Sequence, residues 1–385
     1  MSTAAPRPAP RDPDLLYGQD EEDLRSAVRD LLTDRGGPAA VLAALESPEG
    51  PDPAVWRGLA RDVGVAGLLV PEALGGAGAG PREAAVVLEE LGHGVAPAPY
   101  LTSAVMATSA LLACDTATAA VATLLRDLAE GNRVAVLAVP LTAAPGKPPQ
   151  PTVRAEPTAE GTVLTGEVGH VADAAAADVL LVPARGPEGE GLYAVARADS
   201  ETTALTPLDL TRPLAGVAFR AAAATLLAGP GTAGEAVARA LLTGAGLLAS
   251  EQLGLAQWCL SATVSHTAER HQFGRPVGSF QALKHRMAAL WLDVASARAA
   301  ARNAADALAA GDPDAAVAVA VAQAYCAPVA VRAAQECVQL HGGIGMTWEH
   351  PAHLYLKRAK SDEIALGTPG HHRAALADLV DLAAP

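Results

Sequence analysis

The stretch QLHGGIGMTWEHPAHLYLKRAKSDEIALGTPGHHR, Gln339–Arg373, decides how this chain is interpreted. A helical pattern stops there at a glycine-rich turn, residues 342–345. Because glycine has no Cβ atom, the backbone N–H groups of such a turn can come close to a ligand. Further on, an aliphatic side chain, Leu366, stands directly before a Gly-Thr pair. The stretch therefore indicates a ligand-contacting turn on a helical scaffold.

Length and composition predict a protein of two or three domains that is rich in helix. The chain has 385 residues, half of them apolar but only 3% aromatic, and much of the apolar content is alanine. Alanine has the highest helix propensity, so the long Ala/Leu runs favour helix over strand. The formal net charge of −14 argues against DNA or RNA as a partner, because neutralising phosphates requires clustered Lys and Arg.

The cysteines and the apolar runs give expectations about the compartment. The chain has four cysteines without CxxC or Cys/His spacing: Cys114, Cys259, Cys326 and Cys337. We expect them to be core thiols in a reducing, cytoplasmic compartment.

The Pro-rich residues 1–18 lack the apolar segment of a signal peptide and are expected to form a disordered tail. The apolar run near Ala315–Ala334 is mostly alanine, so no membrane span is expected.

Three regions of the chain differ in their hydrophobic pattern. Residues 19–131 alternate helical patterns with short Gly/Pro breaks, residues 132–229 carry short β-branched runs such as ADVLLVPA, and residues 230–385 return to long helices. Segregated runs of one type predict an α+β multidomain architecture. We expect an N-terminal α-helical domain, a middle β-barrel or β-sandwich domain and a C-terminal four-helix bundle. One apolar stripe is expected to face the bundle core: Leu283, Met287, Leu290 and Trp291.

Two glycine patterns are discounted as nucleotide-binding sites. GAGLLA, residues 244–249, matches a dinucleotide fingerprint, but its flanks are helical and no strand precedes it. GGAGAG, Gly75–Gly80, lacks the Lys-Ser/Thr of a phosphate-binding loop and is expected to be a turn. No HExxH or other metal-ligand spacing occurs, so no metal is expected.

Four stretches carry a resemblance to a known family. GLLVPEALGGAGAGPREAAVVLEELG, residues 67–92, and DLTRPLAGVAF, residues 209–219, are two of them. More specific are ERHQFGRPVGSFQALKHRMA, Glu269–Ala288, and, about fifty residues later, QLHGGIGMTWEHPAHLYLKRA. Together they resemble the acyl-CoA dehydrogenase family of FAD-dependent flavoproteins, and the similarity covers nearly all of the chain after the tail.

The resemblance implies an FAD site shared between two chains. The family's RxQFG arginine and FQ glutamine, here Arg270 and Gln281, reach the adenine half of FAD, whose pyrophosphate suits a planar guanidinium. The QxHGGxG segment approaches the same cofactor across a dimer interface, which implies a homodimer or a dimer of dimers. Phe273 and Phe280 are expected to pack between helices. The implied cofactor-binding set is Arg270, Gln281, Gln339, Leu340, His341, Gly342, Gly343 and Thr368.

The resemblance also implies α,β-dehydrogenation of an acyl-CoA thioester. A carboxylate removes the α-proton while the β-hydrogen passes as hydride to the flavin. The family usually takes this base from an I-x-E-G-T stretch, and matching the Gly-Thr pair places Leu366 there. A subset of the family carries the base on the GAGLLA helix, at the position of Gly244. Neither residue can accept a proton, and a missing general base costs roughly 10²–10⁴-fold in rate.

Two glutamates are candidates for a displaced base. Glu251 lies seven residues after Gly244, about 10 Å along the same helix. Glu363 lies one turn before Leu366 and has a solvated helix charge as its simpler interpretation.

The middle region departs from the family as well. Where the family lines the flavin ring with a TEPxxGSD-like loop and a W/F-I-T/S segment, this chain has AVPLTAAPGKPPQP and VGHVADAAAADVLLV. Four functions remain open. The first is an acyl-CoA dehydrogenase with a displaced base acting on an unusual, bulky thioester, and the second is a non-catalytic partner subunit whose FAD site a paralogue completes. The third is a flavin monooxygenase or oxidase, and the fourth is a simple CoA-ester binder. An electron-transfer flavoprotein is the acceptor that the family implies.

Overall fold

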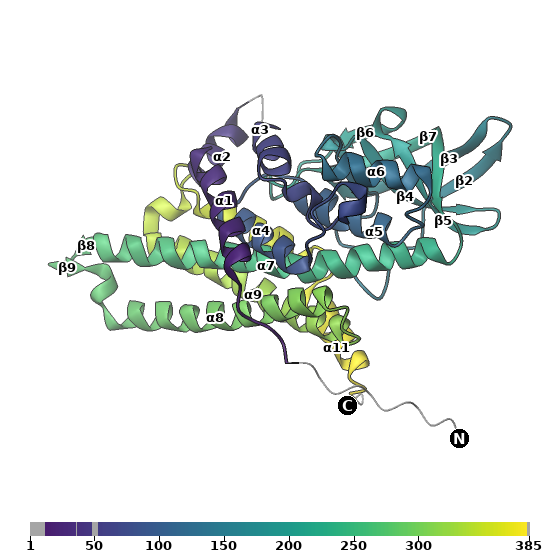
Figure 1. Cartoon of the computed structure of the whole chain (residues 1–385). Coiled ribbons are helices and arrows are strands. Elements are labelled where there is room, and N and C mark those ends of the chain that lie inside the picture. The colour runs from purple at the N-terminus through teal and green to yellow at the C-terminus, as the bar shows by residue number, and fades with distance from the viewer. Residues whose placement is uncertain (1–11, 36, 48–52, 383–385) are drawn as a thin grey trace, which may run out of the picture.

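The computed structural model describes residues 12–35, 37–47 and 53–382. Its elements run in the order helices, strands, helices, and Figure 1 shows the strands of residues 135–228 gathered at one side, above the long helices α7 and α8. This order confirms the predicted α+β architecture with a helical N-terminal domain, a middle β domain and a helical C-terminal domain. The predicted boundaries at residues 131/132 and 229/230 fall in the connections between α6 and β1 and between β7 and α7.

Short helices build the N-terminal domain around α4. Pro81 occupies the first turn of α4, where its missing N–H costs nothing, and the Gly80 N–H donates to the Glu83 carboxylate at 2.8 Å. The buried face of α4 packs against α1 and α7. A π-helical segment, Tyr100–Ala107, precedes α5. The helices are α1 (Gln19–Asp34), α2 (Gly37–Glu46), α3 (Pro53–Arg57), α4 (Pro81–His93), α5 (Thr108–Leu112) and α6 (Ala119–Ala129).

Five strands of the middle domain close into a barrel. Antiparallel pairing runs from β2 to β3, β7, β5 and β4, and a parallel pairing of β4 with β2 closes the ring. β1 adds to β4 and β6 adds to β7. The predicted β-barrel is thus confirmed. The strands are β1 (Ala135–Leu137), β2 (Val153–Thr158), β3 (Gly161–Ala172), β4 (Val179–Gly186), β5 (Gly189–Ala196), β6 (Glu201–Ala204) and β7 (Leu214–Ala228).

Helix α9 is the centre of the C-terminal domain. It packs against α7, α8, α10 and α11, and its buried face is largely alanine, which lets the helices approach closely. In Figure 1, α7 and α8 run side by side out to the small hairpin β8 (His271–Gln272)–β9 (Arg275–Pro276). We call the connection Arg270–Gln281 the arm. The helices are α7 (Thr232–Glu269), α8 (Gln281–Ala309), α9 (Ala315–His341), α10 (Ala352–Ile364) and α11 (Pro369–Leu379).

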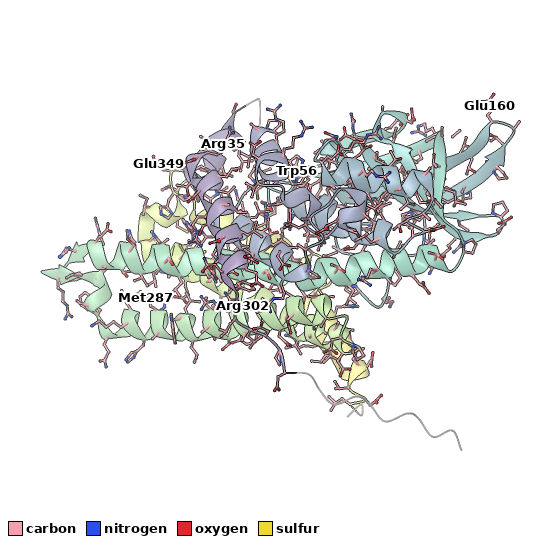
Figure 2. All side chains as sticks on the ribbon, viewed as in Figure 1. Arg35, Trp56, Glu160, Met287, Arg302 and Glu349 are labelled. Atoms are coloured by element: carbon pink, nitrogen blue, oxygen red, sulfur yellow. The ribbon has the colours of Figure 1, made fainter. Side chains whose placement is uncertain are left out.

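The predicted disordered tail needs a correction at its C-terminal end. Residues 1–11 lie outside the described residues, but the following segment is held by hydrogen bonds. The Arg82 guanidinium donates to the Asp14 carbonyl at 2.7 Å, and the Arg302 guanidinium donates to the Leu15 carbonyl at 3.0 Å. Arg302, labelled in Figure 2 on α8, also stacks on the Tyr17 ring at 3.9 Å. These contacts fasten the segment across α4 and α8.

The predicted core stripe of α8 is wrong in part. Leu290 is buried, but Trp291 is 63% exposed, and Met287, labelled in Figure 2 on the outer half of α8, is half-buried. Beyond Leu290 the face that packs inward carries smaller residues: Val294, Ala297 and Ala301. The apolar period was correct, but it did not show that alanines would form the contact.

The two arm phenylalanines also differ from expectation. Phe273 is 89% exposed and lies edge-on to Phe280, with ring centroids 6.1 Å apart. Arg275 stacks on the Phe280 ring at 3.9 Å. They cover one another at the tip of the molecule and do not pack between helices.

The apolar segment of α9 and the thiols lie in the core. By length and composition the helical segment Ala315–Met346 could cross a membrane, with a mean hydropathy of 1.5 in its most apolar window, but 61% of that window is buried inside the protein. Such burial is typical of a bundle's central helix. All four cysteines are free and buried, which confirms the prediction of core thiols.

Candidate functional site

Leu366 lies where the loop after α10 meets α7, the π-helical segment before α5 and the loop after β1. Its side chain is 0% exposed, and its N–H donates to the Leu141 carbonyl at 2.8 Å. A Cβ atom built on Gly244 would lie 3.1 Å from Leu366 Cδ1 and 2.8 Å from Met106 Cγ. The two positions at which the family carries its base are therefore neighbours, and apolar side chains fill the space between them.

The cavity beside this cluster is too small for a substrate. It measures about 10 Å³, and its walls include Met106 and Leu141. A single water molecule needs about that much space. The loop after β1 closes the region with Leu141, Ala143 and Ala144, all buried. This cavity therefore cannot hold a flavin ring or an acyl chain.

Backbone contacts keep Leu366 in place. Its φ angle is +53°, in the left-handed region, which costs a non-glycine residue roughly 1–2 kcal/mol. The His372 ring donates from Nε2 to the Leu366 carbonyl at 3.0 Å. Together with the hydrogen bond to Leu141, this contact holds the aliphatic side chain at the family's base position despite the strain.

Glu251 is part of a buried ion-pair network. Arg212 Nη2 lies 2.7 Å from both Glu251 carboxylate oxygens, and Arg358 Nη1 lies 2.5 Å from Oε1. Burial alone would raise the pKa of Glu251, but the two guanidiniums outweigh it and lower this pKa. The second candidate, Glu363, pairs with Lys360 at 2.8 Å on the outside of α10. Both glutamates are thus engaged in ion pairs in this structure, and a role of either one as the base stays a prediction.

The same network holds an aspartate with an unusual proton affinity. Asp362 accepts from Arg212 at 2.5 Å, and Asp209 accepts from Arg358 at 2.6 Å. Two guanidiniums thus face three carboxylates, so one negative charge is uncompensated. Burial, followed by the charge of Glu251, raises the pKa of Asp362 to about 8. The network joins the β6–β7 connection to α7 and α10.

The predicted adenine-side residues come together at the other end of α7. Arg270 follows the last turn of α7, Gln281 opens α8, and Gln339 lies in the last turn of α9; all three side chains are exposed. An ion pair between Arg286 and Glu336, at 2.7 Å, places the beginning of α8 beside the end of α9. A cation and two amides therefore project from one corner of the molecule.

The glycine turn at this corner is open. Gly342 has φ +64°, and a Cβ atom built on Gly342 or on Gly343 would meet no heavy atom within 4 Å. Leu340 is half-buried, and His341 is buried against α9, where its Nδ1 donates to the Cys337 carbonyl at 2.7 Å. The turn thus offers bare backbone to the outside, as a dinucleotide phosphate or adenine would require. This half of the predicted FAD set fits the cofactor.

Thr368 does not belong to this corner. It caps α11, accepting from the His371 N–H at 3.2 Å, two residues after Leu366. Gly244, which touches Leu366, and Arg270 are both on the α7 axis, 26 residues and therefore about 39 Å apart. A single FAD molecule cannot join them within one chain. A groove of about 990 Å³ opens beside α11, but none of the predicted cofactor residues lines it.

The sequence did not predict that two histidines, His266 and His350, lie beside the glycine turn. The His266 and His341 rings stack with centroids 4.3 Å apart, and the His341 and His350 rings lie 4.4 Å apart. Only one spacing could have suggested that His266 lies near the site: it precedes Arg270 by four residues, which is one helical turn.

Comparison with known proteins places the chain in a family. Residues 18–132 match the family model described as acyl-CoA dehydrogenase, N-terminal domain, and residues 233–380 match the one described as acyl-CoA dehydrogenase, C-terminal domain. The acyl-CoA dehydrogenase IpdE2 of Mycolicibacterium smegmatis is 38% identical over 352 residues, which cover 91% of this chain and 96% of that protein.

Two solved structures share the fold along nearly the whole chain. A chain of the ChsE4–ChsE5 complex from Mycobacterium tuberculosis has a TM-score of 0.83 and 28% identity, covering 97% of this chain and 100% of that one. A variant of the Tcur3481–Tcur3483 steroid ACAD has a TM-score of 0.82 and 30% identity, covering 94% and 98%. The expected resemblance is confirmed, and the chain belongs to the acyl-CoA dehydrogenase family of oxidoreductases.

Proposed function

We propose that this chain is one of two unlike subunits of an FAD-dependent acyl-CoA dehydrogenase. Its partner supplies the base and the pocket for the flavin ring, and this chain supplies the adenine side. The observation that carries the proposal is the fully buried Leu366 packed against Gly244, in a centre with about 10 Å³ of free space. Arg270, about 39 Å away along α7, and the glycine turn after α9 meanwhile stay exposed.

Each exposed residue has a defined task in this proposal. Arg270 offers a permanently charged, planar fork to the pyrophosphate. Gln281 and Gln339 can donate to and accept from the polar edges of the nucleotide. Gly342 and Gly343 let backbone N–H groups approach without a Cβ in the way. Bound FAD supplies the hydride acceptor, and the residues of this chain hold its adenylate half.

The similar proteins support the proposal by their composition. Two solved structures that resemble this chain carry paired names, ChsE4–ChsE5 and Tcur3481–Tcur3483, and the second is named a steroid ACAD. We therefore propose a bulky, polycyclic acyl-CoA thioester as substrate of the assembly and an electron-transfer flavoprotein as its acceptor. The four free, buried thiols support a reducing, cytoplasmic location.

Co-purification tests the proposal. The chain is purified alone and after co-expression with a dehydrogenase-like chain that is encoded by a neighbouring gene and has Glu at the position of Leu366. Flavin content is read from the visible spectrum, and anaerobic bleaching is followed with straight-chain and steroid-type acyl-CoAs. We expect flavin and bleaching in the complex and a colourless lone chain.

The alternatives give different results in the same experiment. Stoichiometric flavin and bleaching in the lone chain would establish an autonomous dehydrogenase and overturn the proposal. Oxygen consumption that depends on externally reduced flavin would favour a monooxygenase or oxidase.

A further inference from the structure

Three histidine rings from three separate segments form a stack behind the arm. His266 comes from the last turn of α7, His341 is the last residue of α9, and His350 precedes α10. The ring centroids are 4.3 Å apart for His266–His341 and 4.4 Å apart for His341–His350, with interplanar angles of 29° and 42°. The central ring is buried between the other two.

The hydrogen bonds around the stack fix the orientation of two rings. His341 Nδ1 faces the Cys337 carbonyl at 2.7 Å, and because a carbonyl only accepts, this nitrogen carries a proton. His350 Nδ1 accepts from the Ala352 N–H at 3.2 Å, so a neutral His350 carries its proton on Nε2. His266 and His341 are stacked and His350 is tilted against His341, and the described residues contain no group of three or more His, Cys, Asp or Glu arranged to hold a metal ion. The stack is therefore a packing device.

What the stack holds together is the two halves of the exposed corner. The Arg270 N–H donates to the His266 carbonyl at 2.9 Å, so the start of the arm follows directly from the backbone that carries His266. Gly342 and Gly343 follow directly from His341. No other element joins the arm to the glycine turn through aromatic rings among the described residues. The His266–His341 contact therefore lies directly between the start of the arm and the glycine turn, at the end of the packed helices α7 and α9.

We propose that His266 and His350 are positioning residues that clamp His341 and thereby set the arm against the glycine turn for FAD. This inference rests on the proposed function, because it concerns the same half-site. It adds a dependence on pH. Two stacked imidazolium rings would repel strongly, so the clamp requires that at most one of the three rings be protonated to the positively charged imidazolium form.

The surroundings favour a positive charge on the central ring over one on either outer ring. Burial lowers the pKa of His341, but its hydrogen bonds to Cys337 outweigh this effect and raise it. Burial and then His341 lower the pKa of His350 to about 4, and the same causes, in that order, lower the pKa of His266. The other charged or titratable groups that act on the stack are Glu269, Arg270, Cys337 and His353.

The sign follows from the lowered values. His266 and His350 bind protons more weakly when stacked than when free, so the clamp loses stability as pH falls from 6.5 toward 4. FAD held by the assembled enzyme is expected to dissociate in this pH range. A phenylalanine at position 266 keeps a ring without a titrating nitrogen and should move the release to lower pH.

The experiment uses the variants H266A, H266F and H350F, with H170N as the matched control. His170 is exposed on β3 and has φ +56°, a conformation that asparagine tolerates. Hydrogen exchange of residues 266–281 and 339–350 is measured in the lone chain at pH 7.5. FAD affinity is measured in the assembled enzyme between pH 7.5 and 4.5. We expect H266A to speed local exchange at least tenfold and to weaken FAD binding about tenfold, while H266F and H350F stay within threefold of wild type.

The outcomes separate this inference from the proposed function. If H266A speeds exchange and H266F restores it, the clamp stands even when the assembled enzyme fails to hold FAD, and only the proposed function falls. Unchanged exchange in H266A overturns the clamp, as does an H266F variant that behaves like H266A. Coinciding acid-release midpoints for wild type and H266F overturn the pH dependence.

Discussion

Gly244 and Leu366 lie in contact: a Cβ atom built on Gly244 would come within 3.1 Å of Leu366 Cδ1. Each occupies a position at which the acyl-CoA dehydrogenase family can carry its catalytic base, one on α7 and the other after α10. Their proximity explains how either position can serve the same reaction in different relatives. In this chain a glycine and a leucine meet there. Neither can accept a proton, and the apolar packing around them leaves no room for a carboxylate.

Restoring a carboxylate at Leu366 is expected to damage the fold without producing an enzyme. L366E would place an unpaired carboxylate beside Met106 and Leu141, with no cavity to hydrate it, and should cost about 2 kcal/mol or more of unfolding free energy. Thermal unfolding and anaerobic bleaching of the lone chain measure this. The control L366M conserves volume and should cost under about 1.5 kcal/mol. A yellow, substrate-bleachable L366E chain would contradict the closed centre.

Replacing Glu251 is expected to affect stability and to leave the chemical step unchanged. In E251Q the guanidiniums of Arg212 and Arg358 lose a shared buried carboxylate, a change that typically costs about 3–5 kcal/mol. Urea unfolding measures the loss, and kcat per folded assembled enzyme should stay within twofold of wild type. The control E363Q removes only a partly exposed i, i+3 pair and should cost under about 1 kcal/mol. Normal stability with abolished turnover in E251Q would restore Glu251 as the base.

Asp362 is expected to make the fold less stable as pH rises toward 8. Its pKa is about 8 in the fold and 3.8 ordinarily, so the folded chain holds a proton that the unfolded chain releases between these values. Stability is full below pH 3.8 and falls by up to about 1.4 kcal/mol per pH unit until pH 8. D362N keeps an acceptor for Arg212 and cannot ionise, so its unfolding midpoint should vary less between pH 6 and 8. D378N, an exposed control on α11, should follow wild type, and identical slopes for wild type and D362N would refute the assignment.

Arg270 is expected to govern retention of FAD in the assembled enzyme. R270A leaves pyrophosphate charge uncompensated and should weaken FAD binding at least tenfold, with a smaller dependence of affinity on salt. Equilibrium dialysis at two salt concentrations measures both effects. The control R220A removes another exposed arginine, on β7 of the barrel, and should leave FAD affinity unchanged. Equal FAD affinity in R270A and wild type would remove the arm from the cofactor site.

Gly343 gives the sharpest test of backbone approach. Because a Cβ at this position meets nothing within 4 Å in the isolated chain, G343A should unfold at the wild-type temperature. In the assembled enzyme the added methyl group would stand between the turn and the nucleotide, so FAD affinity should fall about tenfold. Thermal unfolding and FAD titration together decide this. Undiminished FAD binding by G343A would place the cofactor elsewhere.

The sequence predicted features whose signals are local. The change from helical periodicity to β-branched runs and back predicted the helix–barrel–helix order. The glycine turn and the RxQFG arm predicted which residues would be exposed for a ligand, and the structure places Arg270, Gln281 and Gln339 at one corner. The sequence did not predict that Phe273 would be exposed or that Trp291 would face outward, because hydrophobic periodicity does not reveal which face of a helix meets a neighbour.

The sequence by itself showed that Leu366 and Gly244 stand where the family resemblance implies a base, since residue identity needs no coordinates. Only the tertiary structure decided that these residues touch, that Glu251 is bound between Arg212 and Arg358, and that three histidines stack behind the arm. Each of these relationships joins elements that are far apart in the chain. Contacts of this kind depend on how the helices and the barrel pack together, and the side-chain spacing along one element does not specify that packing.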